Sequence, residues 1–293
     1  MEPHSDHWRE YLMEAGGLGF FMISACAFTT LLEHPGSPIR QWLGNAFLRR
    51  TIVGVGMGLT AIALIYSPWG KQSGAHLNPS VTITFLRLGK LARKDALFYV
   101  LAQFAGAGGG VLVSSLLLNR WISHPAVNYA ATVPGAAGTA MAFGAELVIS
   151  FLLMMAILFA SNSKTVSALT GVIAGVLVAT YISFESPLSG MSMNPARTLG
   201  SAVPSHIWKA WWVYFTAPPI GMLAAGEFYL RLRGADGVLC AKLHHQNDKR
   251  CIFHCGFRER GGPVPNEKAV SRQELARVSC SCGTQDSENR RSV

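Results

Sequence analysis

His-Leu-Asn-Pro-Ser at residues 76–80 and Ser-Met-Asn-Pro-Ala-Arg at residues 192–197 are two copies of one short signature in this chain. Each copy follows a hydrophobic stretch and leads into a short apolar run. An Asn-Pro pair at such a place is typical of a helix start, because proline fits the first helical turn and asparagine suits the cap. Its recurrence in two apolar halves predicts a duplicated membrane protein whose half-helices meet at mid-membrane and form a pore.

The composition also favours a membrane protein. Hydrophobic residues make up 50% of the chain and charged residues 14%, whereas soluble domains average about 25% charged residues. A net charge of +9 would suit a nucleic-acid binder, but the basic residues lie in loops and a tail that flank apolar stretches. There they set the orientation in the membrane and meet anionic lipid. We therefore expect membrane lipid as a partner and no nucleic acid.

The apolar stretches fall into two length classes. A membrane span takes about 20 mostly apolar residues, and six stretches approach that length: residues 11–32, 51–66, 96–118, 139–160, 166–184 and 209–230. Two shorter segments, 79–86 and 195–203, reach only about half-way across a bilayer at about 1.5 Å per residue. Irregular backbone at membrane depth is tolerated only where protein or water surrounds it, so these segments are interpreted as re-entrant half-helices.

The sequence therefore predicts an all-α membrane protein, with six transmembrane helices plus two re-entrant half-helices in an inverted 3+3 repeat. The channel domain is expected at residues 1–232, with repeat 1 at about 8–120 and repeat 2 at about 136–232. Basic residues around spans 2 and 3 and in the tail indicate an integral protein of the cell or inner membrane with both termini cytoplasmic. Basic residues generally prefer the cytoplasmic side of a membrane. Arg49, Arg50 and Arg120 would lie on the opposite side and do not follow this preference.

Three residues are the candidate pore groups. The half-helix N-termini direct positive dipole ends at the membrane centre, where Asn78 and Asn194 offer amide donors to the oxygen of a passing water. A water held in this way donates outward, which interrupts a proton-conducting wire, and a cation is repelled. Arg197 is expensive inside a membrane unless it faces water, so it is expected in the pore rather than at the lipid interface.

Four further polar residues are expected to support the pore. Glu14 and Glu146 lie at equivalent places in spans 1 and 4, where they could relay protons or accept hydrogen bonds from the unwound backbone before each half-helix. We favour the second interpretation. His76 is expected to brace its loop rather than sense pH, and Gln103 to make a packing hydrogen bond in span 3.

From residue 233 to residue 293 the chain is expected to form a basic, cytosolic tail that contains Cys and His and is partly disordered from Gly261 onward. Cys240, Cys251, His254 and Cys255 suggest zinc, although their spacing is not that of a standard zinc knuckle. We favour ordinary cytosolic residues and no bound metal, with a zinc site and redox sensing as the alternatives. A disulfide framework is not expected in a reducing compartment.

These residues resemble the aquaporin (major intrinsic protein) family over residues 1–232. The resemblance rests on the two Asn-Pro motifs, on Arg197 after the second, and on one glutamate in each of spans 1 and 4. The first motif, Asn78-Pro79-Ser80, has serine where the family has alanine, whereas Asn194-Pro195-Ala196 matches. No aspartate follows Arg197, so the chain is more similar to bacterial-type water channels than to glycerol facilitators. The resemblance implies a homotetramer with one pore per subunit, passive flow of water and small neutral solutes, no enzyme activity and no cofactor.

The resemblance also implies a narrow filter of four residues. By matching positions, these are Ile182, Met191, Arg197 and, in span 2, Met57 or Gly58. Strict water channels have histidine at the position of Ile182, so this ring has one donor fewer and is more apolar. We therefore expect a passive channel for water with looser exclusion of small uncharged solutes, closed to protons and ions.

Three alternative functions are open. One is a facilitator mainly for glycerol-like solutes, ammonia or peroxide. Another is a proton-coupled secondary transporter that uses the two span carboxylates, and the last is a structural membrane protein with a vestigial pore. The first remains in the channel class, whereas the other two do not.

Overall fold

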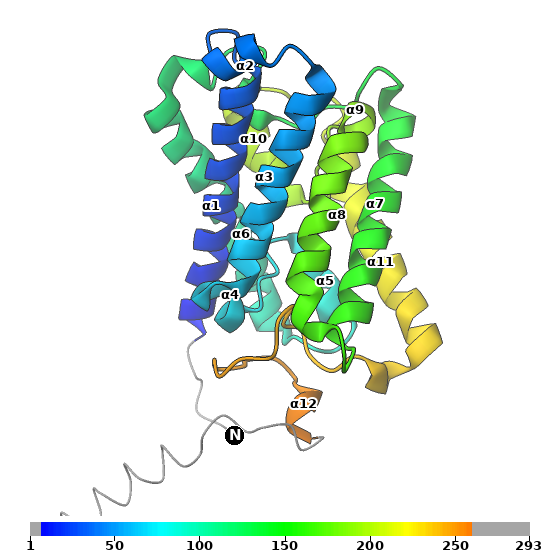
Figure 1. Ribbon diagram of the computed structural model, residues 1–293. Helices are drawn as coiled ribbons and strands as arrows, with labels where there is room; N and C mark the ends of the chain where they lie inside the picture. The colour runs from blue at the N-terminus through cyan, green and yellow to red at the C-terminus, as the bar shows by residue number, and fades with distance from the viewer. Residues whose placement is uncertain (1–6, 260–293) are drawn as a thin grey trace, which may run out of the picture. The chain divides into compact units, whose positions relative to one another are not determined.

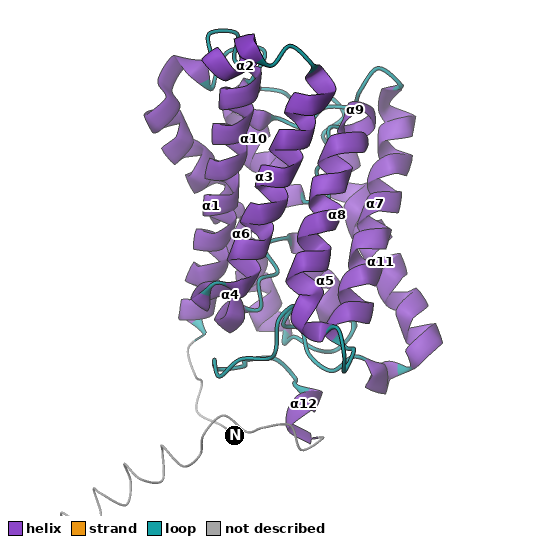
Figure 2. Cartoon of the chain, in the orientation of Figure 1, coloured by secondary structure: helices purple, strands orange, loops and turns teal. Residues whose placement is uncertain are grey.

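The computed structural model describes residues 7–259, and the chain divides into two compact units, Met1–Gly256 and Phe257–Val293. The described residues form helices and loops without strands (Figure 2). The predictions made for residues 261–293, including disorder, lie outside the described part. The long helices are α1 (Trp8–Glu33), α3 (Ala46–Tyr66), α6 (Arg93–Leu118), α7 (Gly138–Ser161), α8 (Thr170–Phe184) and α11 (Trp212–Arg233).

The spans occur where they were expected, with one difference in composition. Among the described residues, five helices are long and apolar enough to cross a membrane, and α11 is not among them. It has the length of a span, at 22 residues, but it contains Pro218 and Pro219, and both Arg231 and Arg233 fall in its last turn. The sixth expected span is therefore a helix of sufficient length and lower hydropathy.

Helix α3 begins at Ala46 rather than at residue 51, so it includes the two arginines that were expected to lie before the span. The Asn45 side chain caps this helix by accepting a hydrogen bond from the Leu48 N–H. A run of apolar residues does not reveal this start, because the first turn is held by polar contacts.

The two half-helices are present as α5 (Pro79–Arg87) and α10 (Pro195–Ser205). Figure 1 shows α5 in the lower and α10 in the upper half of the helix bundle, each beginning near its middle. Each half-helix packs against the last long helix of the opposite repeat, α5 against α11 and α10 against α6. The inverted repeat therefore interlocks its halves.

Short helices precede the half-helices at equivalent places. Helix α4 (Pro68–Ser73) ends at Gly74, with φ of 95°, and α9 (Ser186–Ser189) ends at Gly190, with φ of 82°. These left-handed conformations suit glycine, which has no side chain to clash. The other short elements are α2 (Pro38–Trp42), α12 (Gly256–Glu259) and the 3₁₀ turns at 119–121, 128–130, 167–169 and 235–237.

Helix α1 begins and α11 ends at the same end of the bundle, which we call the terminal end (Figure 1). Residues 238–256 follow α11 and pack there, within the same compact unit as the helices. The Leu239 N–H donates to the Asn162 side chain at 2.7 Å, and the His254 N–H donates to the Lys90 carbonyl at 3.1 Å. This segment thus lies on the loops of the helical part and not apart from it.

The halves approach closely where α3 crosses α8. A Cβ atom placed on Gly58 would lie 2.5 Å from the Gly175 carbonyl oxygen, and one placed on Gly175 would lie 2.6 Å from the Gly58 oxygen. Both distances are below contact, so only glycine fits at this crossing.

Candidate functional site

A cavity of about 580 Å³ runs between the two repeats. At one end its lining includes Glu33 and Arg49, in the middle Asn78 and Asn194, and at the terminal end Leu243. Side chains from both repeats and from the segment after α11 therefore enclose a single space. This cavity is the candidate site.

Both asparagines cap their half-helices. The Asn78 Oδ1 accepts from the Ser80 N–H at 2.8 Å, and the Asn194 Oδ1 accepts from the Ala196 and Arg197 N–H groups at 3.0 and 3.2 Å. These bonds satisfy donors that a helix N-terminus otherwise leaves free. They also fix each amide so that its nitrogen points away from its own half-helix.

The same asparagines join the two motifs. The Asn78 Nδ2 donates to the Met193 carbonyl at 2.7 Å, and the Asn194 Nδ2 donates to the Leu77 carbonyl at 2.8 Å. An amide nitrogen carries two hydrogens, and one is used in each of these bonds. The second is available to the cavity that both asparagines line.

The loop before the second motif is held by Glu146 of α7. Its Oε1 accepts from the Ser189 hydroxyl at 2.8 Å and the Ser192 N–H at 2.6 Å, and its Oε2 accepts from the Met193 N–H at 2.7 Å. The hydroxyl of Tyr214 donates to the Ser189 carbonyl. One buried carboxylate therefore satisfies consecutive backbone donors that no helix bonds.

Glu14 of α1 holds the first loop in the same way. Its Oε1 accepts from the Ser73 hydroxyl at 2.8 Å and the His76 N–H at 3.0 Å, and its Oε2 accepts from the Leu77 N–H at 2.6 Å. Tyr99 corresponds to Tyr214 of the second loop, because its hydroxyl donates to the Ser73 carbonyl at 2.7 Å.

Our sequence reasoning missed the two serines and the two tyrosines that complete these loops. The serines lie at the same spacing before the two asparagines, so comparing the repeats residue by residue would have found them. The tyrosines lie in the long helices that follow each motif and carry no such signal.

Each loop also contains two non-glycine residues with left-handed backbone. Ala75 and Leu77 have φ of 55° and 48°, and Met191 and Met193 have φ of 49° and 53°. Such a conformation costs of order 1–3 kcal/mol per residue and persists only where the surroundings impose it. The carboxylates supply that constraint, because each accepts from two consecutive N–H groups within its turn.

Arg197 lines the cavity, and its Nη1 donates to the hydroxyl of Thr132. Thr132 is buried in the connection between the repeats, where no motif marks it. This partner fixes the guanidinium against the cavity wall, and sequence reasoning missed it.

The other expected filter residues also reach the cavity. Met57, Ile182 and Met191 all line it, whereas Gly58 faces the backbone of α8. Of the two span-2 alternatives, Met57 is thus the one in the lining.

His76 and Gln103 lie behind the first motif. The His76 ring is buried, with Nδ1 3.1 Å from the Thr82 hydroxyl and Nε2 2.9 Å from the Ala241 carbonyl oxygen. The Gln103 amide donates to Glu14 Oε2 at 2.9 Å and to the Thr82 hydroxyl at 3.0 Å. Both side chains are therefore bonded within the protein, and of the two residues His76 also borders the cavity.

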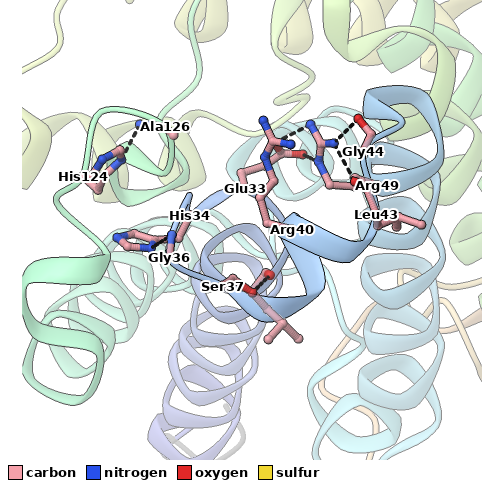
Figure 3. A network of polar contacts seen from close by, with 11 residues as sticks. Glu33, His34, Gly36, Ser37, Arg40, Leu43, Gly44, Arg49, His124 and Ala126 are labelled. Atoms are coloured by element: carbon pink, nitrogen blue, oxygen red, sulfur yellow. Dashed lines mark hydrogen bonds and ion pairs between the residues drawn. The ribbon is translucent and has the colours of Figure 1, made fainter.

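At the end opposite to the terminal end, a charged network borders the cavity (Figure 3). The Arg49 Nε and Nη2 each donate to the Glu33 carboxylate at 3.1 Å, and its Nη1 donates to the carbonyls of Leu43 and Gly44. Arg50 donates to the Ser183 carbonyl at 2.9 Å. Of the three arginines expected on the side opposite to the cytoplasm, Arg49 and Arg50 are thus structural at this mouth.

Three of the four residues considered as metal ligands lie together. Cys240, Cys251 and Cys255 come together, but the fourth member of the group is His245. His254 points elsewhere, with its Nδ1 2.8 Å from the Gly89 carbonyl oxygen. Spacing alone favours His254 because it is adjacent to Cys255, but the hydrogen bond to Gly89 holds the His254 ring away from the cysteines.

Comparisons with a family model and with individual proteins point to the same family. A family model described as Major intrinsic protein matches residues 2–229. Aquaporin NIP1-4 of Oryza sativa subsp. japonica is 37% identical over 182 residues, which cover 62% of this chain and 64% of that protein. Aquaporin NIP2-3 of Zea mays is 34% identical over 199 residues, which cover 68% of this chain and 64% of that protein. The chain thus spans less than two thirds of the length of these relatives.

Among solved structures, the X-ray structure of the aquaglyceroporin from Plasmodium falciparum is similar with a TM-score of 0.66. The similarity covers 76% of this chain and 96% of that chain at 23% identity. It supports the all-helical fold, and at this identity it supports the fold alone.

Proposed function

The chain belongs to the major intrinsic protein family, and on that premise we propose that it is a passive membrane channel for water and small uncharged solutes, not an enzyme. The observation that carries the proposal is the cavity lined by Asn78 and Asn194, at which two half-helices of opposite repeats begin. The relatives of similar sequence are named as aquaporins, which agrees with this proposal.

Charge at the centre argues for exclusion of cations and protons. Two helix N-termini each contribute about half a positive charge at the same place, and Arg197 adds a full one along the cavity. A water at the centre accepts from the two asparagine amides. Its two hydrogens then point in opposite directions along the row of water molecules in the cavity. Such a water interrupts proton relay while it passes freely itself.

The candidate filter favours water without strict exclusion of other neutral solutes. It combines one guanidinium with the apolar side chains of Met57, Ile182 and Met191. One fixed donor with three apolar walls suits a small molecule that has both a hydroxyl and an apolar side. Glycerol-like solutes are therefore the second candidate, and we place water first because no acidic residue follows Arg197.

A proton-coupled transporter fits the contacts less well. A relay carboxylate must gain and lose a proton during transport, but both oxygens of Glu14 and of Glu146 accept hydrogen bonds from loop backbone. Protonation of either would break the loop that places an asparagine. We therefore assign these carboxylates a supporting role in the proposed channel.

We further propose a homotetramer in the membrane with both termini cytoplasmic. Large apolar side chains are exposed on the long helices, among them Leu116 at 77% and Leu117 at 73%, which suits contact with lipid or with a second subunit. Chemical cross-linking in vesicles would test the tetramer, with a ladder ending at four subunits as the expected result.

The function is tested by stopped-flow light scattering on proteoliposomes. Fast osmotic shrinkage that is independent of a proton gradient is expected, with slower but measurable glycerol entry. The matched control is the Ala174→Trp variant, in which a bulky side chain at a cavity-lining residue of α8 should block the cavity. Solute uptake that requires a proton gradient would exclude the channel.

A further inference from the structure

We propose that Cys240, His245, Cys251 and Cys255 bind a structural Zn²⁺ ion, and that the loaded site holds residues 238–256 against the terminal end of the cavity. These ligands lie outside the helical part and take no part in the proposed permeation. The proposal therefore stands independently of the channel function.

The four ligand atoms lie close enough together for one metal ion to draw them into a tetrahedral arrangement. All four lie within 4.8 Å of one another, and the two sulfurs of Cys240 and Cys251 are 3.6 Å apart. A Zn–S bond of about 2.3 Å in a tetrahedron separates two sulfurs by about 3.8 Å. A disulfide would bring them to about 2.05 Å, and these cysteines are free.

The chemistry of the ligand set selects zinc. Three thiolates and one imidazole without an open position are typical of structural Zn²⁺ sites, whereas magnesium and calcium prefer oxygen. The segment between Val238 and Cys255 has no helix or strand. The segment buries Val238, Ala241, Leu243 and Phe253 but has no regular backbone hydrogen bonding of its own, so a metal adds a direct link between its two ligand-bearing stretches.

A buried lysine complements the charge of such a site. Three thiolates around Zn²⁺ leave one net negative charge. Lys242 is only 2% exposed, and its ammonium donates to the carbonyls of Lys249 at 3.1 Å and Arg250 at 2.7 Å. These carbonyls immediately precede Cys251, so the lysine joins both ligand-bearing stretches and places a positive charge beside them.

The ligand loops reach the cavity directly. The Leu243 N–H donates to the Gly74 carbonyl at 3.1 Å, and its side chain lines the cavity. Phe253 stacks on the His76 ring at 5.4 Å between centroids. Both residues lie within three positions of a ligand. A metal that fixes the ligands therefore also fixes Leu243 and Phe253 at this end of the cavity.

The first test is the metal content of the full-length protein, purified in detergent without chelators. Elemental analysis should give about one zinc per chain, and replacement by Co²⁺ should give the visible absorption of a tetrahedral thiolate site. The Cys251→Ser and His245→Ala variants should lose the metal. Cys26→Ser, in α1, and His254→Ala are the matched controls and should keep it. Absence of zinc, a Cys240–Cys251 disulfide in its place, or loss of zinc in His254→Ala would overturn the site.

The second test follows the segment itself by limited trypsin digestion and intact-mass measurement. Cleavage after buried Lys242 requires the segment to open, whereas Lys249 and Arg250 are exposed. Chelation of the metal should raise cleavage after Lys242 at least about tenfold in wild type, and Cys251→Ser should be cleaved at that high rate without chelator. Equal cleavage with and without metal would overturn the holding role. Neither readout depends on water flux, so failure of the metal site and failure of the channel are distinguishable.

Discussion

Replacement of Glu146 by glutamine tests how strongly the carboxylate holds the loop before the second motif. In the variant, the amide oxygen keeps the bonds to Ser189 and Ser192, but an amide nitrogen replaces Oε2 and faces the Met193 N–H. A buried N–H without an acceptor costs about 1–3 kcal/mol, and two bonds that lose their charged acceptor weaken by about 1 kcal/mol each. Glu146→Gln should therefore destabilise the protein by about 3–5 kcal/mol.

This loss is large enough to measure. At about 2–4 °C per kcal/mol, the melting temperature should fall by roughly 6–20 °C. Tryptophan fluorescence during a scan at one fixed rate is the assay, because membrane proteins unfold irreversibly and only matched scans compare. Water permeability in proteoliposomes should fall as well, since the Met193 carbonyl also receives the Asn78 amide.

Ser150→Ala is the matched control for this variant. Ser150 lies one helical turn further along α7, is fully buried, and its hydroxyl has no hydrogen-bond partner among the described residues. Its loss should shift the melting temperature by no more than about 2 °C, because no bond is broken. If Glu146→Gln behaved like this control in both stability and permeability, the loop would not depend on the carboxylate and the reasoning would be refuted.

Three more variants test the filter and the helix crossing. Ile182→His should lower the flux of glycerol relative to that of water in vesicle swelling. Val176→His, at an exposed position of the same helix outside the cavity lining, should not change this ratio; equal ratios in the two variants would remove Ile182 from the filter. Arg197→Ala should raise the proton leak of vesicles that contain a pH-sensitive dye, and an unchanged leak would count against its role in exclusion. Gly58→Ala should cost about 1–3 kcal/mol, because its Cβ would lie 2.5 Å from a backbone oxygen of α8. Gly144→Ala, where a Cβ meets nothing within 4 Å, should leave the melting temperature unchanged or raise it.

The sequence was sufficient for the helices that apolar length defines and for the two half-helices that an Asn-Pro pair starts. It was less informative where polar contacts decide the structure. The early start of α3 depends on the Asn45 cap, and the partner of Arg197 is Thr132, a residue of an unremarkable loop. Local pattern carries no information about such tertiary neighbours.

The cysteine segment shows the same limit. Sequence spacing grouped His254 with the three cysteines, whereas the fold brings His245 to them. The choice is made by hydrogen bonds to distant loops, such as that of His254 with Gly89. Likewise, only the packing of α3 on α8 separates Met57, in the cavity lining, from Gly58, in the helix contact.

The interlocking of the repeats has a consequence for how the chain is made. The ribosome completes the first repeat before α10 and α11 exist, yet α5 packs on α11 and α10 packs on α6. Until the second repeat is inserted, α5 has no α11 to pack against. The first repeat therefore has to remain in or beside the insertion machinery with α5 unpacked. Two separately expressed fragments, divided between α6 and α7, should accordingly be degraded when alone and accumulate when produced together.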